Sequence, residues 1–183
     1  MRLFVSVVPP EEVLAHLDEF VEPRRLVDDG PRWISKRYWH LTLAFMAEVA
    51  ERDLIEVEER LGEVAQRSRP FDLALTAAGV FPNPMAAKVL WAGVAEDGHE
   101  PLGRLAARCR TAVGRAGAKV DGATFRPHLT LARWRVPVEA TRWIKAFSAY
   151  EGPAWTVDRF ELVHSQLGHA GPPHYDTVAE YLL

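Results

Sequence analysis

The sequence WHLTLAF, residues 39–45, alternates polar and apolar side chains, and its core HLTLA returns unchanged at residues 128–132. Such alternation is typical of a half-buried β-strand, in which successive side chains point to opposite faces. His40 and Thr42 are predicted to share one face, about 6.5 to 7 Å apart at roughly 3.3 Å per residue. An imidazole and a hydroxyl can then reach one phosphate-sized group. The opposite, apolar face is predicted to hold Leu41, Leu43 and Phe45.

The second copy repeats this arrangement with His128 and Thr130. A single His-x-Thr arises easily by chance, and one strand histidine is more often structural. Two copies, 88 residues apart in a chain of 183, indicate two similar lobes that contribute matching strands. Strands that face each other would form a cleft with two imidazoles and two hydroxyls, so each copy supplies half a site.

Composition limits the function classes. A length of 183 residues and 48% hydrophobic residues suit one domain over residues 1–183. The net charge of −3 argues against a broad cationic surface for long nucleic acid, but allows a small or end-bound phosphate substrate. The single Cys109 excludes an internal disulfide and has the spacing of a helical core residue. No apolar run approaches the ~20 residues of a membrane span, so we expect a cytoplasmic monomer without a membrane partner.

Hydrophobic periodicity predicts strands alternating with helices on both sides of the midpoint. A helical stripe runs through residues 13–21, and Phe81 to Pro84 is predicted to turn a hairpin. Further strands are expected over residues 3–8, 71–75, 87–94, 155–167 and 175–182, and further helices over residues 51–66, 102–113 and 137–147.

Two histidines that titrate near neutral pH can act as a complementary acid and base. Threonine hydroxyls can donate to non-bridging phosphate oxygens, where negative charge accumulates in the transition state. This set of groups suits in-line phosphodiester cleavage without a metal or another cofactor. The facing symmetry alone does not say which histidine is the acid.

Beyond the doubled motif, the chain resembles the two-histidine (2H) phosphoesterases, and within them the bacterial and archaeal RNA 2′,3′-cyclic phosphodiesterases, historically called 2′-5′ RNA ligases. The resemblance covers nearly the whole chain. It is carried by both His-Leu-Thr-Leu motifs and by residues 2–5, residues 43–45, Phe125, Pro127, Arg133, Ser165, Leu167, Gly171 and Tyr175.

The resemblance implies a bilobal α+β fold with a pseudo-two-fold internal repeat, in which two antiparallel β-sheets flank a central cleft and helices lie outside. It implies hydrolysis of RNA 2′,3′-cyclic phosphate ends, or of small cyclic nucleotides, to 2′-phosphomonoesters. By position, His40 matches the proton donor and His128 the proton acceptor, while Thr42 and Thr130 match the phosphate-binding hydroxyls. Two departures affect substrate contacts: His164 stands where relatives often carry a basic residue, and Tyr38 where they often carry Asn.

Other residues have a functional and a structural interpretation. Arg133 is a candidate for phosphate binding or for a surface salt bridge. Phe45 and Trp39 are candidates for stacking on a base, although strand aromatics are more often core. The evenly spaced His164, His169 and His174 raise the possibility of a metal site, which the absence of cysteine or a nearby carboxylate cluster disfavours.

Three alternatives remain open at this stage. Within the same fold, the chain could ligate RNA through a 2′-5′ bond, or hydrolyse another small cyclic phosphate or a 2′-5′ oligonucleotide. A non-catalytic RNA-end-binding protein is the alternative of a different class. It is disfavoured because a binding protein has no need of two proton-transfer groups.

Overall fold

A computed structural model describes residues 1–27, 30–122, 124–166, 168 and 173–183 of the chain. The α-helices are α1 (Glu11–Val21), α2 (Leu54–Gln66), α3 (Glu96–Arg115) and α4 (Thr141–Phe147), and the short 3₁₀ turns are η1 (Glu22–Leu26), η2 (Lys36–Tyr38), η3 (Glu51–Asp53) and η4 (Pro84–Ala86). The strands are β1 (Leu3–Val7), β2 (Arg32–Trp33), β3 (Leu41–Met46), β4 (Phe71–Leu73), β5 (Leu75–Phe81), β6 (Ala87–Val94), β7 (Leu129–Val138), β8 (Trp155–Val157), β9 (Arg159–Gln166) and β10 (His174–Leu182).

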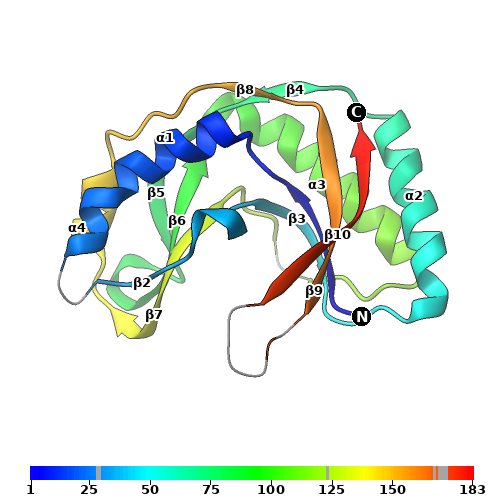
Figure 1. The fold of residues 1–183 in the computed structure, drawn as a ribbon, viewed down its shortest axis with the longest axis horizontal. Coiled ribbons are helices and arrows are strands. Elements are labelled where there is room, and N and C mark those ends of the chain that lie inside the picture. The colour runs from blue at the N-terminus through cyan, green and yellow to red at the C-terminus, as the bar shows by residue number, and fades with distance from the viewer. Residues whose placement is uncertain (28–29, 123, 167, 169–172) are drawn as a thin grey trace.

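The main sheet consists of two antiparallel halves that meet at one residue pair. Its strand order is β10-β9-β1-β3-β7-β6-β5, with β2 also on β7. Strands β3 and β7 pair only through Leu41 opposite Leu129, and both leucines are buried. The half around β1 and β3 forms one lobe and the half around β6 and β7 the other (Figure 1). The predicted bilobal α+β fold with antiparallel sheets is therefore confirmed.

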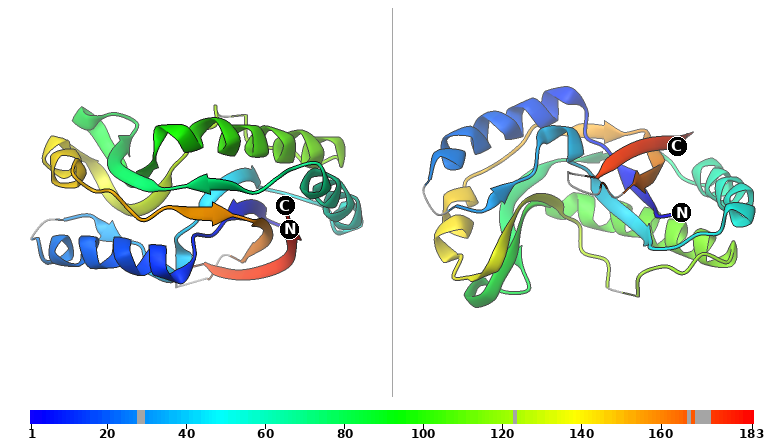
Figure 2. Two further views of the ribbon diagram at one scale, coloured as in Figure 1. Left: turned by 90° about the horizontal axis from the view of Figure 1, so that it is seen from above. Right: turned by 60° about the horizontal axis from the view of Figure 1, so that its bottom comes forward.

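The helices lie outside the strands. Helices α2 and α3 pack against each other and against β10 and β3 respectively, while α4 packs against β5. Helix α1 follows β1 in the chain yet lies beside α4, where Phe20 meets Phe147 at 5.3 Å between ring centroids. Seen from above, α1 and α3 lie on opposite sides of the molecule, with β4 and β8 between them (Figure 2). Within the described residues, no helix is long and apolar enough to span a bilayer.

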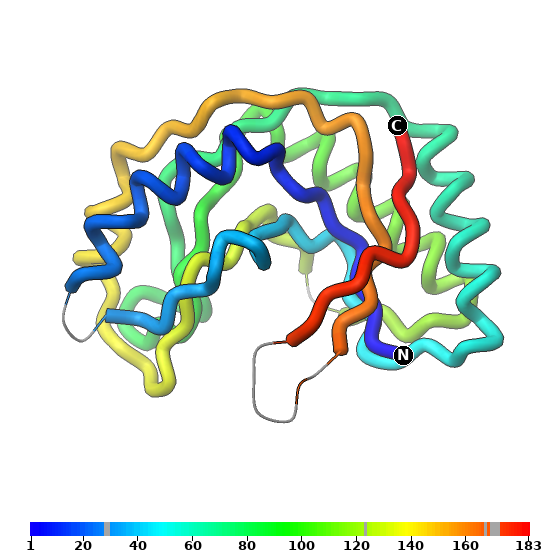
Figure 3. The backbone as a smooth tube through the Cα atoms, in the orientation of Figure 1, coloured from blue at the N-terminus to red at the C-terminus, as the bar shows by residue number. Residues whose placement is uncertain are grey.

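The lobe that holds the first His-x-Thr strand has β1 at its centre. Strand β1 pairs with β3 on one side and β9 on the other, and β10 completes the series (Figure 3). All five β1 side chains are buried. Cys109 is buried in α3, as its spacing predicts, and burial raises the pKa of its thiol to about 12.

Some predicted boundaries are wrong because the partner strands, not the local pattern, set them. The predicted strand over residues 71–75 divides at Ala74, since β4 pairs with β8 while β5 pairs with β6. The predicted strand over residues 155–167 divides at Asp158 for the same reason. Leu167, the end of that prediction, lies outside the described residues.

Two helix boundaries also differ from the prediction. The predicted helix over residues 137–147 begins only at Thr141, because β7 continues to Val138, which pairs with Ala87. β-branched residues such as Val136 and Val138 favour extended backbone. Helix α3 begins at Glu96, six residues before the predicted start, and has two acidic residues in its first turn. The predicted hairpin around residues 81–84 is confirmed, since β5 and β6 pair antiparallel.

Candidate active site

One cavity of about 370 Å³ lies where the two lobes meet. It is lined by both histidines and both threonines of the doubled motif, together with Arg2, Phe4, Ile34, Tyr38, Phe45, Asp121, Arg133, Ser165 and Tyr175. The alternation in residues 39–45 and 128–132 predicts that His40, Thr42, His128 and Thr130 gather in one cleft, and the structure places them there.

The antiparallel join between the lobes explains how the four side chains come together. Leu41 and Leu129 face each other and are 1% and 0% exposed, so both point into the core. Their neighbours therefore point to the other side, into the cavity. Because the strands run in opposite directions, Thr130 is the cross-strand counterpart of His40, and His128 that of Thr42. A local two-fold axis through the leucine pair relates the two half-sites.

A bulge in each strand extends the cavity-facing series. Along β3, Thr42 pairs with Ser6 but Ala44 pairs with Val5, which leaves Leu43 as an extra residue. An extra residue reverses the alternation beyond it. Phe45 therefore lines the cavity beside His40 and Thr42, and the prediction that it lies on the opposite face is wrong.

The second lobe has the same bulge. Along β7, Thr130 pairs with Trp91 but Ala132 pairs with Leu90, which leaves Leu131 as the extra residue. Arg133 is then brought to the cavity, five residues after its histidine, as Phe45 is in the first lobe. The internal repeat thus includes the β-bulge, which follows the His-x-Thr motif in both lobes.

Both histidines are held by the same hydrogen bond. Nδ1 of His40 lies 2.7 Å from the carbonyl oxygen of Tyr38, and Nδ1 of His128 lies 2.6 Å from that of Arg126. A carbonyl only accepts, so each Nδ1 carries the hydrogen and donates it. In the neutral imidazole, Nε2 is then the free lone pair. The same tautomer is set in both half-sites, and Nε2 is the atom available for proton transfer.

Aromatic rings fix the two imidazoles in different ways. Phe4 of β1 stacks on His40 with a centroid separation of 4.7 Å and an angle of 20°, and the Tyr175 ring meets His40 edge-on at 5.8 Å. Phe81 and Trp91 meet His128 edge-on at 4.9 and 6.1 Å. The two half-sites are alike in hydrogen bonding and unlike in ring contacts.

The surroundings make both imidazoles weaker bases. Burial lowers the pKa of His40 to about 4, with a smaller effect in the same direction from His128. Burial also lowers the pKa of His128, assisted by the nearby Arg133 guanidinium. In both cases the carbonyl hydrogen bond opposes the effect on the pKa. Both histidines are therefore neutral at pH 7 in the unliganded protein.

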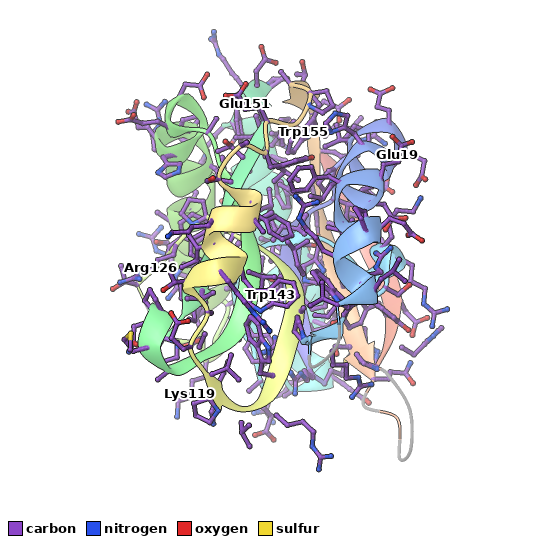
Figure 4. The ribbon with its side chains drawn as sticks, turned by 90° about the vertical axis from the view of Figure 1, so that its left-hand side faces the viewer. Glu19, Lys119, Arg126, Trp143, Glu151 and Trp155 are labelled. Carbon is purple, nitrogen blue, oxygen red and sulfur yellow. The ribbon has the colours of Figure 1, made fainter. Side chains whose placement is uncertain are left out.

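Other candidates divide between cavity and core. Arg133 is exposed, and among the described residues it forms no ion pair, so the salt-bridge interpretation is not supported there. The guanidinium of Arg2 lies 4.8 Å from the centre of the Phe45 ring. Trp39 is 2% exposed and donates from Nε1 to the Ile34 carbonyl at 3.1 Å, so of its two interpretations the core one applies, and it is not a candidate for base stacking. Arg126 extends from the outer edge of the molecule (Figure 4).

Two of the late histidines, His164 and His174, do not line the catalytic cavity. His164 is half-buried on β9, and Nε2 of His174 lies 2.8 Å from a carboxylate oxygen of Asp176. His169 lies outside the described residues. Across the part of the chain that the structure describes, no group of three or more potential ligands could hold a metal ion.

Sequence reasoning missed several residues that line the cavity. Phe4 carries no signal for a role at the site beyond its place in residues 2–5 of the family resemblance, because every side chain of β1 is buried and the strand has no alternation. Arg2 belongs to the opening residues 2–5 that carry the family resemblance, but nothing in the sequence gives it or Asp121 a place at the site, and only tertiary structure brings them to the histidines. Tyr38 appears in the sequence as a departure from a pattern, yet its carbonyl orients His40.

A bilobal α+β fold with one His-x-Thr strand from each lobe at a shared cavity defines the two-histidine phosphoesterase class. The sequence model of the 2′-5′ RNA ligase superfamily matches residues 9–169. The chain belongs to this superfamily.

Curated relatives agree with this assignment. An RNA 2′,3′-cyclic phosphodiesterase of Archaeoglobus fulgidus is 32% identical over 177 residues, which cover 96% of this chain and 97% of the relative. One of Thermotoga maritima is 29% identical over 174 residues, covering 94% and 90%.

Solved structures share the fold. A protein of Thermus thermophilus, 31% identical, superposes with a TM-score of 0.77 over 100% of this chain and 98% of that one. Escherichia coli LigT, whose structure is known in complex with 3′-AMP, is 24% identical and superposes with a TM-score of 0.80. The superposition covers 100% of this chain and 97% of LigT.

Proposed function

We propose that the chain is a metal-independent RNA 2′,3′-cyclic phosphodiesterase that converts RNA 2′,3′-cyclic phosphate ends to 2′-phosphomonoesters. The observation that carries the proposal is the matched pair of imidazoles in one cavity, each with Nδ1 bound to a carbonyl and Nε2 free. The names of the relatives support the substrate class.

The reaction needs two proton transfers at opposite sides of phosphorus. Nε2 of His128 takes a proton from water, whose oxygen forms the new bond to phosphorus. The bond from phosphorus to the 3′ oxygen breaks, and Nε2 of His40 gives its proton to that oxygen. The products are a 2′-phosphomonoester and a 3′ hydroxyl. The hydroxyls of Thr42 and Thr130 donate to the non-bridging oxygens as charge accumulates there.

The lowered pKa values suit His128 as the base, but His40 can act as the acid only if the bound substrate raises its pKa. A neutral His128 at pH 7 can accept the proton of water at once. His40 must be protonated, although its pKa in the free protein is about 4. An anion within about 4 to 6 Å favours the charged imidazole. The bound cyclic phosphate therefore raises the pKa of His40, and the acid forms in the complex.

Arg133 and Phe45 complete the proposed site. The Arg133 guanidinium can bind a phosphate oxygen, and its position in the lining of the cavity that holds His128 supports this role. Phe45 offers its ring to the terminal base, and the guanidinium of Arg2 lies 4.8 Å from the centre of that ring. We further propose a single 183-residue domain of two lobes, a monomeric state and a cytoplasmic location.

The proposal is tested with an oligoribonucleotide that ends in 2′,3′-cyclic phosphate, in the presence of excess EDTA. We expect hydrolysis exclusively to the 2′-phosphate, because the proposed chemistry uses only side chains. The roles are tested with a 3′-bridging sulfur in place of oxygen, since a thiolate leaves without a proton. This substrate should largely restore activity to His40→Ala and leave His128→Ala inactive.

Three results would contradict the proposal. Activity that disappears with EDTA and returns with a divalent ion would require a metal mechanism. Restoration of His128→Ala instead of His40→Ala would exchange the two roles. Full activity of both alanine variants would remove the acid–base mechanism, whereas a wild-type protein that binds the cyclic end without hydrolysing it would favour the RNA-end-binding alternative. Ligation through a 2′-5′ bond is the same chemistry with a 5′ hydroxyl in place of water, and the same assay detects it as a longer product.

A further inference from the structure

A second, larger cavity continues from the catalytic one. Its volume is about 760 Å³, against about 370 Å³ for the catalytic cavity. The two share the lining residues Arg2, Ile34, Tyr38, Arg133 and Tyr175, so they form one continuous surface. The second cavity, here called the arginine groove, is defined by its five arginines: Arg2, Arg32, Arg37, Arg133 and Arg135.

No described residue neutralises the positive charge of the arginine groove. None of its five arginines forms an ion pair with a described residue, and none of the described residues in its lining is acidic. Elsewhere, Arg60 and Arg159 pair with carboxylates at 2.7 and 3.0 Å. Although the whole chain has a net charge of −3, five of its cationic side chains are therefore concentrated in the arginine groove.

Two of the arginines are placed where they repel each other. Arg32 on β2 lies directly opposite Arg133 on β7 in the antiparallel pair, and both are exposed. Like charges directly opposite in a sheet are destabilising. An anion bound between them would remove this repulsion. The pair lies at the entrance to the catalytic cavity, since Arg133 lines both spaces.

Aromatic rings alternate with these cations. Trp33 and Trp134 are half-buried in the lining and pack edge-on against Trp143 of α4, at 5.8 and 6.1 Å between centroids. Arg37 lies over the Tyr38 ring at 4.7 Å. Cations that follow a backbone, interleaved with rings on which bases stack, are the features that recognise single-stranded nucleic acid.

We propose that the arginine groove binds the RNA strand that precedes the cyclic end, so that the preferred substrate is an oligonucleotide and not a mononucleotide. This inference rests on the proposed function. A 2′,3′-cyclic phosphate closes the 3′ end, and the strand continues from it in only the 5′ direction. With the terminal phosphate at the histidines, the preceding phosphates meet Arg32 and Arg135, and the preceding bases meet Trp33 and Trp134.

The test measures two substrates with the double variant Arg32→Gln/Arg135→Gln, here called the groove variant. Neither altered residue lines the catalytic cavity. We expect kcat/KM for an eight-nucleotide RNA with a cyclic end to fall about tenfold at low salt. The plot of log kcat/KM against log salt should become less steep by about 1.4, since each lost contact to a single strand removes about 0.7. Hydrolysis of a cyclic mononucleotide should not change.

A control removes the same charge elsewhere. Arg67→Gln/Arg104→Gln alters two outer arginines, one just after α2 and one on α3, whose side chains are 77% and 64% exposed. This variant should behave as the wild type with both substrates. An equal loss with both substrates in the groove variant, or no loss with the oligonucleotide, would overturn the proposal.

A binding measurement separates the groove from the proposed chemistry. Fluorescence anisotropy with an eight-nucleotide RNA that ends in 2′-phosphate needs no turnover. We expect about tenfold weaker binding to the groove variant than to the wild type. If the wild type hydrolyses neither cyclic substrate, the proposed function fails, and this measurement still decides on the groove. Equal affinity in the two proteins would overturn it.

Discussion

His40 and His128 have the same hydrogen bond and the same tautomer, so their different environments must separate their roles. Phe4 covers one face of the His40 ring, whereas Phe81 and Trp91 present edges to His128. Burial lowers the pKa of both, and that of His40 to about 4. Two chemically identical side chains are thereby placed in unequal environments, which an acid–base pair requires.

These pKa values predict an acidic optimum for kcat/KM. The profile of kcat/KM reports the free enzyme, which must have His40 protonated and His128 neutral. Protonated His40 becomes scarce above about pH 4, and neutral His128 becomes scarce below its own lowered pKa. The bell should therefore have its maximum below about pH 6.5, the ordinary pKa of histidine. The optimum of kcat should lie at higher pH, because bound phosphate raises the pKa of His40. A kcat/KM maximum above pH 7 would contradict this explanation.

Among single residues, the sequence identifies the proposed proton-transfer groups and misses what surrounds them. A doubled His-x-Thr is visible because its chemistry and spacing are local. The roles of Phe4 and Arg2 at the cavity are not visible, since these residues reach it only through the pairing of β1 with β3. Trp39 and Phe45 flank the first motif as similar aromatics, yet one is core and the other lines the cavity. The bulge at Leu43, which strict alternation does not anticipate, separates them.

At the scale of elements, the β5–β6 hairpin positions His128 through the Trp91 side chain, which packs closely on the backbone of Gly79. The Trp91 indole lies across Gly79, where a Cβ would come within 2.2 Å of the ring. Phe81, on the same strand as Gly79, contacts both Trp91 and His128. The hairpin thus supplies the two rings that hold the second imidazole.

Gly79→Ala should therefore damage both stability and activity. The new methyl group must displace the indole, and overpacking of this kind costs about 1 to 3 kcal/mol of unfolding free energy. A displaced Trp91 shifts the support of His128, so kcat/KM should fall as well. Urea denaturation and kinetics measure the two effects. Gly103→Ala on α3 is the control, because no atom lies within 4 Å of its Cβ position. Unchanged stability and activity in the Gly79 variant would show that the hairpin does not position His128.

A helix or strand is predictable where its own residues contain the complete hydrophobic pattern. The stripe of Val57, Leu61 and Val64 predicts α2, and these three residues are buried in it. Boundaries fail where the pattern continues while the partner strand changes, as at Ala74, where alternation runs unbroken from β4 into β5. Information about the partner strands is distributed over distant segments, so no local pattern contains it.

Considered as a whole molecule, the two lobes are tied together at both edges. Their sheets meet at Leu41 and Leu129, and β4 and β8 bridge the opposite side (Figure 1). Helix α1 leaves its own lobe to pack on α4 of the other. Neither lobe keeps a complete core without the other.

We therefore expect a single cooperative unfolding transition for all 183 residues. Calorimetric and van't Hoff enthalpies should agree, as they do for two-state domains. Leu129→Ala should lower the unfolding free energy by about 2 to 5 kcal/mol, the cost of a cavity in a packed core. It should do so without splitting the transition. Two resolved transitions in either protein would mean that the lobes are independent domains.

The matched bulges at Leu43 and Leu131 have a consequence for how a substrate can enter. Two imidazoles and two hydroxyls related by a local two-fold axis look the same after half a turn, so on their own they would accept a cyclic phosphate in two opposite poses. Each bulge adds one more side chain to this set, and here the lobes differ: a ring at Phe45, a cation at Arg133. A nucleobase suits the first and a phosphate oxygen the second. If Phe45 and Arg133 have the proposed roles, the same backbone irregularity, repeated with different side chains, selects one pose and thereby decides which oxygen leaves.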